Sequence, residues 1–343
     1  MLSSRDSPLA SYHAYAIPIV AMKALKIDTL RISVTDYCNL NCLYCSPNKR
    51  EKQISDDYLS WDELYEIVGE FSKHGIHRVK ITGGEPFCRE GLVDFIGQLK
   101  KLPLTDISIT TNGTLARPYL KDLYAAGLKR ITFSLDALCE KIYRELSGQD
   151  LLGDVWGSVE EALKIGFSPI KLNTVIIKGV NESEIVKLSK LTTAHKINLR
   201  FIELMQQGES DEEWSRRFIS SDEIKKILIS EFGELMSSIR SNDGTHVKVF
   251  RIPEALGSIG FISPNSDKFC DDCAKLRLTS KGVAKTCLRS SEVVDLKKMI
   301  GNKRLLSQGV ESIVSLKRDQ LQRIRDKLEE PKRICHPMKE VGG

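Results

Sequence analysis

The sequence has no apolar run long enough to form a membrane-spanning helix, which needs about 20 consecutive apolar residues. Its one short apolar patch near the N-terminus, residues 14–22, follows a single positive residue, Arg5, and no clear small-residue cleavage site comes after it. We therefore interpret residues 1–28 as a lead-in segment rather than a signal peptide. We expect a cytoplasmic protein with no membrane partner.

The sequence also lacks a basic segment with interleaved aromatic residues, a pattern that indicates nucleic-acid binding. The net charge is only +5, from 51 Lys and Arg against 46 Asp and Glu, and it is spread along the chain. This balance does not require a nucleic-acid partner, and it suits a small anionic substrate. The length of 343 residues allows one large domain or two smaller ones.

The nine cysteines do not show the paired spacing of a secreted disulfide framework. In a chain of this size, such usage indicates a reducing compartment and metal ligation. Three cysteines are scattered, and six form two triplets: Cys38, Cys42 and Cys45 with the spacing C-x3-C-x2-C, and Cys270, Cys273 and Cys287 with the spacing C-x2-C-x13-C.

The first triplet directly follows an apolar alternating run, residues 30–34, that is typical of a strand. Its cysteines are therefore expected on a loop at the carboxyl end of a strand, where α/β enzymes place their chemistry. Three thiolates can hold three irons of a [4Fe–4S] cluster and leave the fourth iron open to a ligand. Zinc with a distant fourth ligand, or buried structural thiols, are the alternatives.

The second triplet leaves the same choice open. It indicates either a second cluster with an open iron or a zinc site completed by Cys335, His336 or a water molecule. The spacing alone does not separate these two readings.

Six apolar segments alternate with helix-forming segments, and this rhythm predicts a parallel sheet covered by helices. One helix is expected to begin at Ser60, where residues 60–63 have the capping-box pattern. Six such units suit an incomplete (β/α)6 barrel of the TIM type, and a doubly wound open sheet is the alternative. The expected strands are residues 30–34, 78–82, 106–111, 130–135, 171–177 and 198–204.

The rhythm changes after about residue 206. Residues 206–221 are polar and are expected to form a loop, and one or two helices are expected near the C-terminus. We place a soft boundary near residue 235, between a partial barrel at residues 29–235 and a C-terminal region at residues 236–343. This region would carry the second triplet and close the open side of the barrel.

The first triplet, with Tyr44 directly before its last cysteine, resembles the cysteine motif of radical S-adenosylmethionine (SAM) enzymes. In that family the open iron of the cluster binds the amino and carboxylate groups of SAM. The turn at residues 83–86 is ordinary by itself, although paired glycines let a ligand approach the backbone and a carboxylate can accept bonds from an ammonium group. The resemblance implies that Gly83, Gly84 and Glu85 receive the methionyl amine. It further implies SAM contacts by Tyr44 and Met205 beside the adenine, by Ser134 at the carboxylate or ribose, and by Asn173.

A larger set of stretches resembles one radical SAM family, the GTP 3′,8-cyclases of molybdenum cofactor biosynthesis (MoaA proteins). The resemblance covers the chain from about residue 29 to its Gly-Gly end. The stretches are residues 30–36, 82–86, 110–113, 134–136, 171–175, 200–205, 269–273, 276–279, 287–288 and 341–343.

This resemblance implies conversion of GTP to (8S)-3′,8-cyclo-7,8-dihydroguanosine 5′-triphosphate, the first step of molybdopterin synthesis. A 5′-deoxyadenosyl radical would abstract the ribose 3′ hydrogen, and the resulting carbon radical would add to C8 of guanine. Two [4Fe–4S] clusters and SAM would be the cofactors, with the second cluster orienting guanine. Gly342 and Gly343 would reach into the active site and assist catalysis. The implied contacts to GTP are Arg31, Lys80, Thr110, Lys171, Arg200, Lys275, Leu276 and Arg277.

The implied partners are a low-potential electron donor of the flavodoxin or ferredoxin type and the next enzyme of the pathway, cyclic pyranopterin monophosphate synthase. A homodimer is left open. Two positions depart from the family pattern: Ala274-Lys275 replaces the usual Asn-Arg, and Lys80 stands where an Arg is common. Charge is kept at Lys275 and Lys80 but the planar guanidinium fork is lost, so triphosphate binding is expected with altered affinity.

Two other functions compete with this reading. A radical SAM peptide-modifying enzyme with an auxiliary cluster would use the same first triplet, but such enzymes usually carry more cysteines near the C-terminus. A zinc-bearing basic nucleic-acid-binding protein would explain both triplets and the net charge. It would not explain the turn at residues 83–86 or the six βα units.

Overall fold

The computed structural model describes residues 27–45, 57–237, 247–267 and 270–328. Within these ranges six strands follow one another through the sheet, each parallel to the next, which confirms the predicted βα rhythm. The six strands are β1 (Thr29–Ser33), β2 (Arg78–Thr82), β3 (Asp106–Thr111), β4 (Arg130–Ser134), β5 (Ile170–Ile176) and β6 (Ile197–Glu203).

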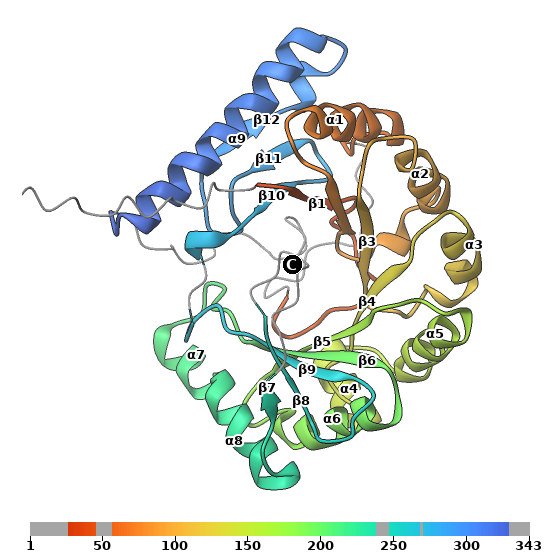
Figure 1. Cartoon of the computed structure of the whole chain (residues 1–343), viewed down its shortest axis with the longest axis vertical. Helices are drawn as coiled ribbons and strands as arrows, with labels where there is room; N and C mark the ends of the chain where they lie inside the picture. Colours follow the sequence, from red (N-terminus) through yellow and green to blue (C-terminus); the bar gives the residue numbers. More distant parts are fainter. Residues whose placement is uncertain (1–26, 46–56, 238–246, 268–269, 329–343) are drawn as a thin grey trace, which may run out of the picture.

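The C-terminal region adds strands to both edges of this sheet. At one edge β9 (Ser258–Ile262) pairs in parallel with β6 and is followed by the antiparallel β8 (Lys248–Arg251) and β7 (Met236–Ser237). At the other edge β10 (Lys275–Leu278) pairs in parallel with β1 and is followed by the antiparallel β11 (Val283–Lys285) and β12 (Val293–Asp295). Because β12 and β7 are the two end strands, the curved sheet is an open barrel and not a closed one (Figure 1).

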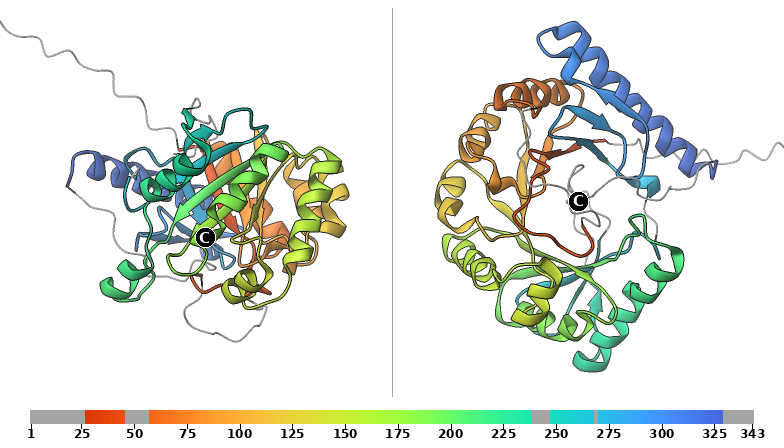
Figure 2. Two further views of the ribbon diagram at one scale, coloured as in Figure 1. Left: turned by 90° about the horizontal axis from the view of Figure 1, so that it is seen from below. Right: turned by 180° about the vertical axis from the view of Figure 1, so that it is seen from behind.

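Helices cover the outside of the strands as a ring (Figure 2). The first begins as predicted, because the Ser60 hydroxyl accepts a bond from the Glu63 N–H and the Glu63 carboxylate accepts one from the Ser60 N–H. No helix in the described part of the chain combines the length and hydropathy of a membrane span. The ring contains α1 (Trp61–Lys73), α2 (Leu92–Leu99), α3 (Leu120–Ala125), α5 (Leu152–Ile165), α6 (Ile185–Ala194) and α8 (Ser221–Phe232), with short 3-10 turns η1 (Pro86–Cys88), η2 (Arg117–Tyr119) and η3 (Glu182–Glu184).

Two helices were not predicted. The expectation of a loop at residues 206–221 is wrong, because α7 (Asp211–Arg217) forms there, and α4 (Glu140–Ser147) follows β4. The signal for α7 was present, since Ser210 and Glu213 form a second capping box.

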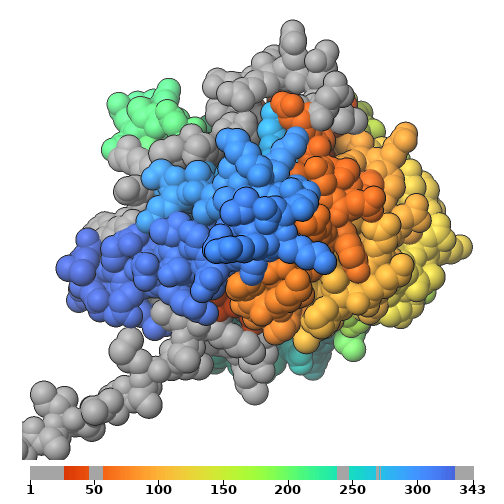
Figure 3. Space-filling view, turned by 90° about the horizontal axis from the view of Figure 1, so that it is seen from above, coloured from red at the N-terminus to blue at the C-terminus, as the bar shows by residue number. Residues whose placement is uncertain are grey.

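Near the C-terminus a single long helix, α9 (Lys303–Arg325), packs against α1 and β12. It lies beside the β10–β12 strands and the α1 region on one face of the molecule (Figure 3). Two 3-10 turns, η4 (Cys270–Asp272) and η5 (Lys297–Met299), precede it and also contact it.

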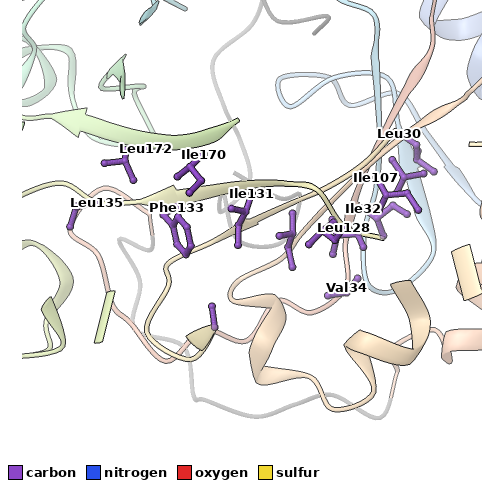
Figure 4. Packing of buried hydrophobic residues seen from close by; sticks show 14 of the residues in the cluster. Leu30, Ile32, Val34, Ile107, Leu128, Ile131, Phe133, Leu135, Ile170 and Leu172 are labelled. Atoms are coloured by element: carbon purple, nitrogen blue, oxygen red, sulfur yellow. The ribbon is translucent and has the colours of Figure 1, made fainter. Parts of the chain in front are cut away.

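The two faces of the parallel strands differ in chemistry. Alternate residues of a strand point to opposite faces, and one set, which includes Leu30, Ile32, Ile131 and Phe133, is apolar and buried (Figure 4). The other set is polar and charged, although parallel strands usually carry apolar residues on both faces. An ordinary barrel interior is filled by apolar side chains, but the inner face of these strands is polar. We therefore place the candidate site on this inner face.

Candidate active site

The loop after β1 carries the first cysteine triplet at the carboxyl end of the strand, as predicted. The unpredicted helix α4 anchors this loop. The Asn41 N–H donates to the Ser147 carbonyl at 2.9 Å, and the Leu43 N–H donates to the Leu146 carbonyl at 3.0 Å. The position of the three thiols therefore depends on a helix that sequence reasoning missed.

The same loop passes so close to the glycine pair after β2 that a side chain there would collide with the loop backbone. The Gly84 N–H donates to the Thr35 carbonyl at 2.6 Å, and the Glu85 N–H donates to the Tyr37 carbonyl at 2.8 Å. A Cβ at Gly84 would lie 2.2 Å from the Tyr37 carbonyl oxygen. The side-chain-free backbone thus accommodates another protein segment, whereas the sequence had suggested room for a ligand.

Glu85 is fully buried beneath the loop. Its carboxylate accepts bonds from the Thr111 hydroxyl at 2.8 Å and from the Asn112 N–H at 2.6 Å. Burial nevertheless raises the pKa of this carboxyl to about 7. Because both oxygens of Glu85 already accept bonds from the protein, its contact with a methionyl amine stays a prediction.

Asn112 is a site residue that the sequence reasoning did not single out. Its side-chain N–H₂ lies 3.7 Å from the Cys38 Sγ and 2.9 Å from the Asn39 Oδ1. It therefore connects the turn after β3 to the first cysteine of the triplet. Its position in the turn at residues 110–113 was the available signal.

The three thiols of the first triplet lie on one short loop, in which the Cys45 N–H donates to the Cys42 carbonyl at 3.1 Å. Burial, and then Glu85, raises the pKa of the Cys38 thiol to about 12, and Cys45 acts in the same direction. Burial, and then Asp136, raises the pKa of Cys42, to which Cys45 and Cys38 also contribute. Metal ligation at this triplet must therefore displace protons.

Across the described ranges, no three His, Cys, Asp or Glu side chains converge on a single ion position. Each cysteine of a [4Fe–4S] cube binds a different iron, so a cluster does not require such convergence. The residues present suit a cluster in this respect.

Tyr44 and Met205, both predicted to contact adenine, line one cavity of about 300 Å³. The Tyr44 hydroxyl donates to the Asp136 Oδ2 at 2.6 Å, and Asp136 Oδ1 accepts from the Val175 N–H at 2.8 Å. The Gln207 side-chain amide donates to the Tyr44 carbonyl at 2.5 Å. Asp136 thus holds the ring of Tyr44, and Gln207 holds its backbone.

The second triplet also forms one group. Cys270 begins η4, Cys273 precedes β10, and Cys287 follows β11. Burial raises the pKa of the Cys270 thiol, and Cys287 and Cys273 act in the same direction. The alternative zinc ligands Cys335 and His336 lie outside the described residues.

Cations predicted to bind GTP gather on the inner face of the barrel. Lys171 and Arg200 are 7% and 5% exposed. Burial lowers the pKa of Lys80 well below its usual range, and Arg31, Lys275, Arg200 and Lys171 lower it further in that order. Burial likewise lowers the pKa of Arg31, with Arg277 next in effect. Such a buried group of like charges is arranged for an anion.

Two predicted contacts have unsatisfied polar atoms. Within the described ranges, the buried Thr110 Oγ1 and the buried Asn173 Oδ1 have no hydrogen-bond partner. An unpartnered buried polar atom is costly unless a ligand or water satisfies it. The register places both on the inner face, since Thr110 aligns with Thr132, Thr132 with Lys171, and Asn173 with Arg200.

The side chain of Leu276 does not face the inner cavity, and its contact with GTP stays a prediction. It is fully buried in the hydrophobic core and aligns with Leu30, so its side chain lies on the opposite face from Lys275 and Arg277. Only its backbone is available to a ligand on the inner face. Gly342 and Gly343 lie outside the described residues.

The inner cavity also has lining residues that were not predicted. They alternate with the apolar residues of the same strands, and this parity was the available signal. They are Thr29, Arg78, Asp106, Ser108, Arg130 and Thr132.

Comparison with known proteins agrees with this geometry. Residues 32–192 match the Radical SAM superfamily, and residues 197–323 match the family described as Molybdenum Cofactor Synthesis C. The chain is 40% identical over 272 residues to a GTP 3′,8-cyclase of Alkaliphilus metalliredigens, covering 79% of this chain and 83% of the relative. It is 36% identical over 320 residues to a GTP 3′,8-cyclase of Clostridium botulinum, covering 93% and 98%.

Among solved structures, Streptococcus suis SuiB bound to S-adenosylmethionine has a TM-score of 0.56 at 16% identity, covering 81% of this chain and 62% of that one. At this identity the likeness shows the fold alone, and this chain spans about three fifths of that structure. The two family matches together span most of the chain, and both sequence relatives exceed a third identity over more than four fifths of their length. The chain therefore belongs to the GTP 3′,8-cyclase family of radical SAM enzymes.

Proposed function

We propose that this protein converts GTP to (8S)-3′,8-cyclo-7,8-dihydroguanosine 5′-triphosphate, with SAM as the source of the radical. One observation carries the substrate class: Lys80 shares one inner cavity with Arg31, Lys171 and Lys275, inside a barrel whose mouth holds the first cysteine triplet. The cations occupy the strand interiors and the triplet lies beyond the strand ends. The triphosphate would therefore bind deep in the barrel, with the nucleoside toward the triplet.

The chain's own residues bind and orient the reactants. Tyr44 and Met205 would hold the adenine of SAM in their shared cavity, and Ser134 and Asn173 would contact its polar groups. When bound, the first cluster and SAM supply a carbon radical, which the barrel must shield from solvent. Arg31, Lys80, Lys171 and Arg200 would neutralise the triphosphate and fix the ribose relative to that radical.

The inner cavity is only about 50 Å³, which is room for one or two water molecules. A triphosphate therefore requires the long Lys and Arg side chains to move aside. Flexible side chains make this movement possible without a change of the strands.

Cys270, Cys273 and Cys287 would hold a second [4Fe–4S] cluster, which would bind guanine through its open iron. The match of residues 197–323 to Molybdenum Cofactor Synthesis C supports this assignment. Lys275 and Arg277 follow Cys273 closely in the chain and align with Thr29 and Arg31 of β1, so the triplet adjoins the cation group. The Gly342–Gly343 end would enter the same pocket.

The remaining assignments follow from the proposed activity. The protein would act in the cytoplasm, receive electrons from a flavodoxin or ferredoxin, and pass its product to cyclic pyranopterin monophosphate synthase. The partial barrel would comprise residues 29–235 and the second-cluster region residues 236–343, and a homodimer is compatible with both. A peptide-modifying function is not favoured, because the sequence relatives are GTP 3′,8-cyclases and the likeness to SuiB is one of fold.

Anaerobic reconstitution tests the proposal. Two clusters predict about eight irons per chain, and replacement of either triplet by alanine should leave about four. The variant with Cys270, Cys273 and Cys287 replaced should still cleave SAM reductively but form no product from GTP. Stoichiometric zinc without iron would contradict the cluster assignment, and loss of SAM cleavage in a folded variant with four irons would contradict the division of roles.

A further inference from the structure

Lys317 is a buried cation that has no role in the proposed cyclisation reaction. It lies in the middle of α9 and is 1% exposed, while the next residue, Arg318, is exposed. Burial of an ammonium group costs several kcal/mol unless an opposite charge compensates it. Within the described ranges no carboxylate forms an ion pair with Lys317, and the acidic partners near the end of this helix bind Arg323 and Arg325 instead.

Lys317 lies close enough to the second triplet to act electrostatically on two of its thiols. Helix α9 packs directly against η4, which begins with Cys270. Of the cationic side chains that act on the Cys273 thiol, Lys317 has the strongest effect, ahead of Lys275 and Arg277. Lys317 also acts on the Cys270 thiol.

The other cations near this triplet have different positions. Lys275 lines the inner cavity and Arg277 aligns with Arg31, so both face the proposed triphosphate site. Lys317 comes from α9, outside the sheet, and does not line that cavity. Its charge is therefore directed at the cysteines and not at the substrate.

We propose that Lys317 is the buried counter-ion of the second cluster, a positioning residue whose charge compensates that of the cluster and stabilises its reduced state. This inference rests on the proposed second cluster. Three thiolates give a [4Fe–4S] cluster a net negative charge, and reduction adds one more. A fixed cation in a low-dielectric environment compensates that charge, and net charge near a cluster sets its reduction potential. The cluster in turn removes the cost of burying the ammonium group.

The test uses the full-length chain with Cys38, Cys42 and Cys45 replaced by alanine, so that only the second cluster is observed. Lys317→Met keeps the length of the side chain and removes its charge. Arg318→Met removes one charge from the exposed face of the same helix and is the matched control. We expect Lys317→Met to release iron to a chelator about tenfold faster, as for other residues that support metal ligands. We also expect its midpoint potential to become more negative, while Arg318→Met changes neither quantity.

Thermal unfolding separates this role from a merely structural one. Without iron, Lys317→Met should be as stable as its parent or more stable, because an uncompensated buried charge is gone. After reconstitution the same variant should be less stable than its parent. Destabilisation of both forms would show that Lys317 holds the fold rather than the cluster.

Two failures are distinguishable. If the parent protein binds no iron at the second triplet, that result contradicts both the proposed second cluster and this inference. If the parent binds four irons but Lys317→Met retains the same potential and iron-release rate, the inference about Lys317 is overturned and the proposed function stands.

Discussion

The Tyr44 hydroxyl donates a 2.6 Å hydrogen bond to the Asp136 Oδ2 and so joins the first cysteine loop to the carboxyl end of β4. Burial raises the pKa of Asp136 to about 6, while this bond and the Val175 N–H oppose the rise. The ordinary value is about 3.9 in an unfolded chain. The folded state therefore holds this proton more tightly, and the stability that Asp136 contributes is lost as the pH rises from about 4 through 6.

Tyr44→Phe should increase the stability that is lost as the pH rises, because it removes a hydrogen bond to the charged Asp136 carboxylate. We expect a destabilisation of about 1.5–3 kcal/mol at pH 8 and a smaller one at pH 5, where Asp136 is largely protonated. Urea unfolding of the iron-free protein at the two pH values measures the difference. Tyr119→Phe, at a half-exposed ring for which the described chain shows no hydroxyl bond, is the control. Equal destabilisation of Tyr44→Phe at both pH values would contradict the coupling.

Lys80→Met should stabilise the nucleotide-free protein and at the same time weaken its binding of GTP. Four neighbouring cations repel Lys80, so its removal should raise the melting temperature of the nucleotide-free protein. The same change removes a charged partner of the triphosphate and should weaken GTP binding roughly 10- to 100-fold. Calorimetric titration under anaerobic conditions measures the affinity, with the exposed Lys101→Met as control. Unchanged GTP affinity in Lys80→Met would contradict the placement of the triphosphate on the inner face.

Gly84→Ala should displace the first cysteine loop, because the added Cβ would lie 2.2 Å from the Tyr37 carbonyl oxygen. We expect a loss of about 1–3 kcal/mol or more and retention of only the second cluster's iron. Gly97→Ala in α2 is the matched control, since nothing lies within 4 Å of its added Cβ. It should stabilise the helix by about 0.5–1 kcal/mol. A Gly84→Ala protein with full iron content would show that the two segments can separate without cost.

The sequence predicted the parts of the fold that local pattern determines. The bounds of β2 and β3 are as expected, and those of β1, β4, β5 and β6 differ by about one residue. The parallel pairing of β10 with β1 joins residues far apart in the chain and has no local signal. Helix α4 was also missed, although it holds the cysteine loop.

Motif spacing located residues that the structure gathers into groups, whereas it said nothing of the direction in which each side chain points. Motifs picked out both cysteine triplets and the cations of the inner face, and their roles in binding stay predictions. The family resemblance implied a contact between Leu276 and GTP, but alternation along β10 directs the Leu276 side chain into the core. Lys317 could not be found, because a Lys in a charged helix is normally exposed and only packing reveals its burial.

Deletion of Gly342 and Gly343 tests the predicted role of the C-terminal end. A residue without a side chain can enter a narrow pocket that a larger residue would block. We expect the deletion to leave both clusters and GTP affinity nearly intact and to lower cyclisation strongly. A short peptide with the missing sequence should restore part of the activity, because the pocket would still be formed. Unchanged turnover after deletion would remove these residues from the mechanism.

The most direct test follows hydrogen transfer from GTP. The reconstituted protein is incubated anaerobically with SAM, a low-potential reductant and GTP that carries deuterium at the ribose 3′ position. Mass spectrometry should then find deuterium in 5′-deoxyadenosine, together with the 3′,8-cyclised triphosphate in equal amount. Cleavage of SAM without deuterium transfer, with GTP recovered unchanged, would contradict the assignment of GTP as the substrate.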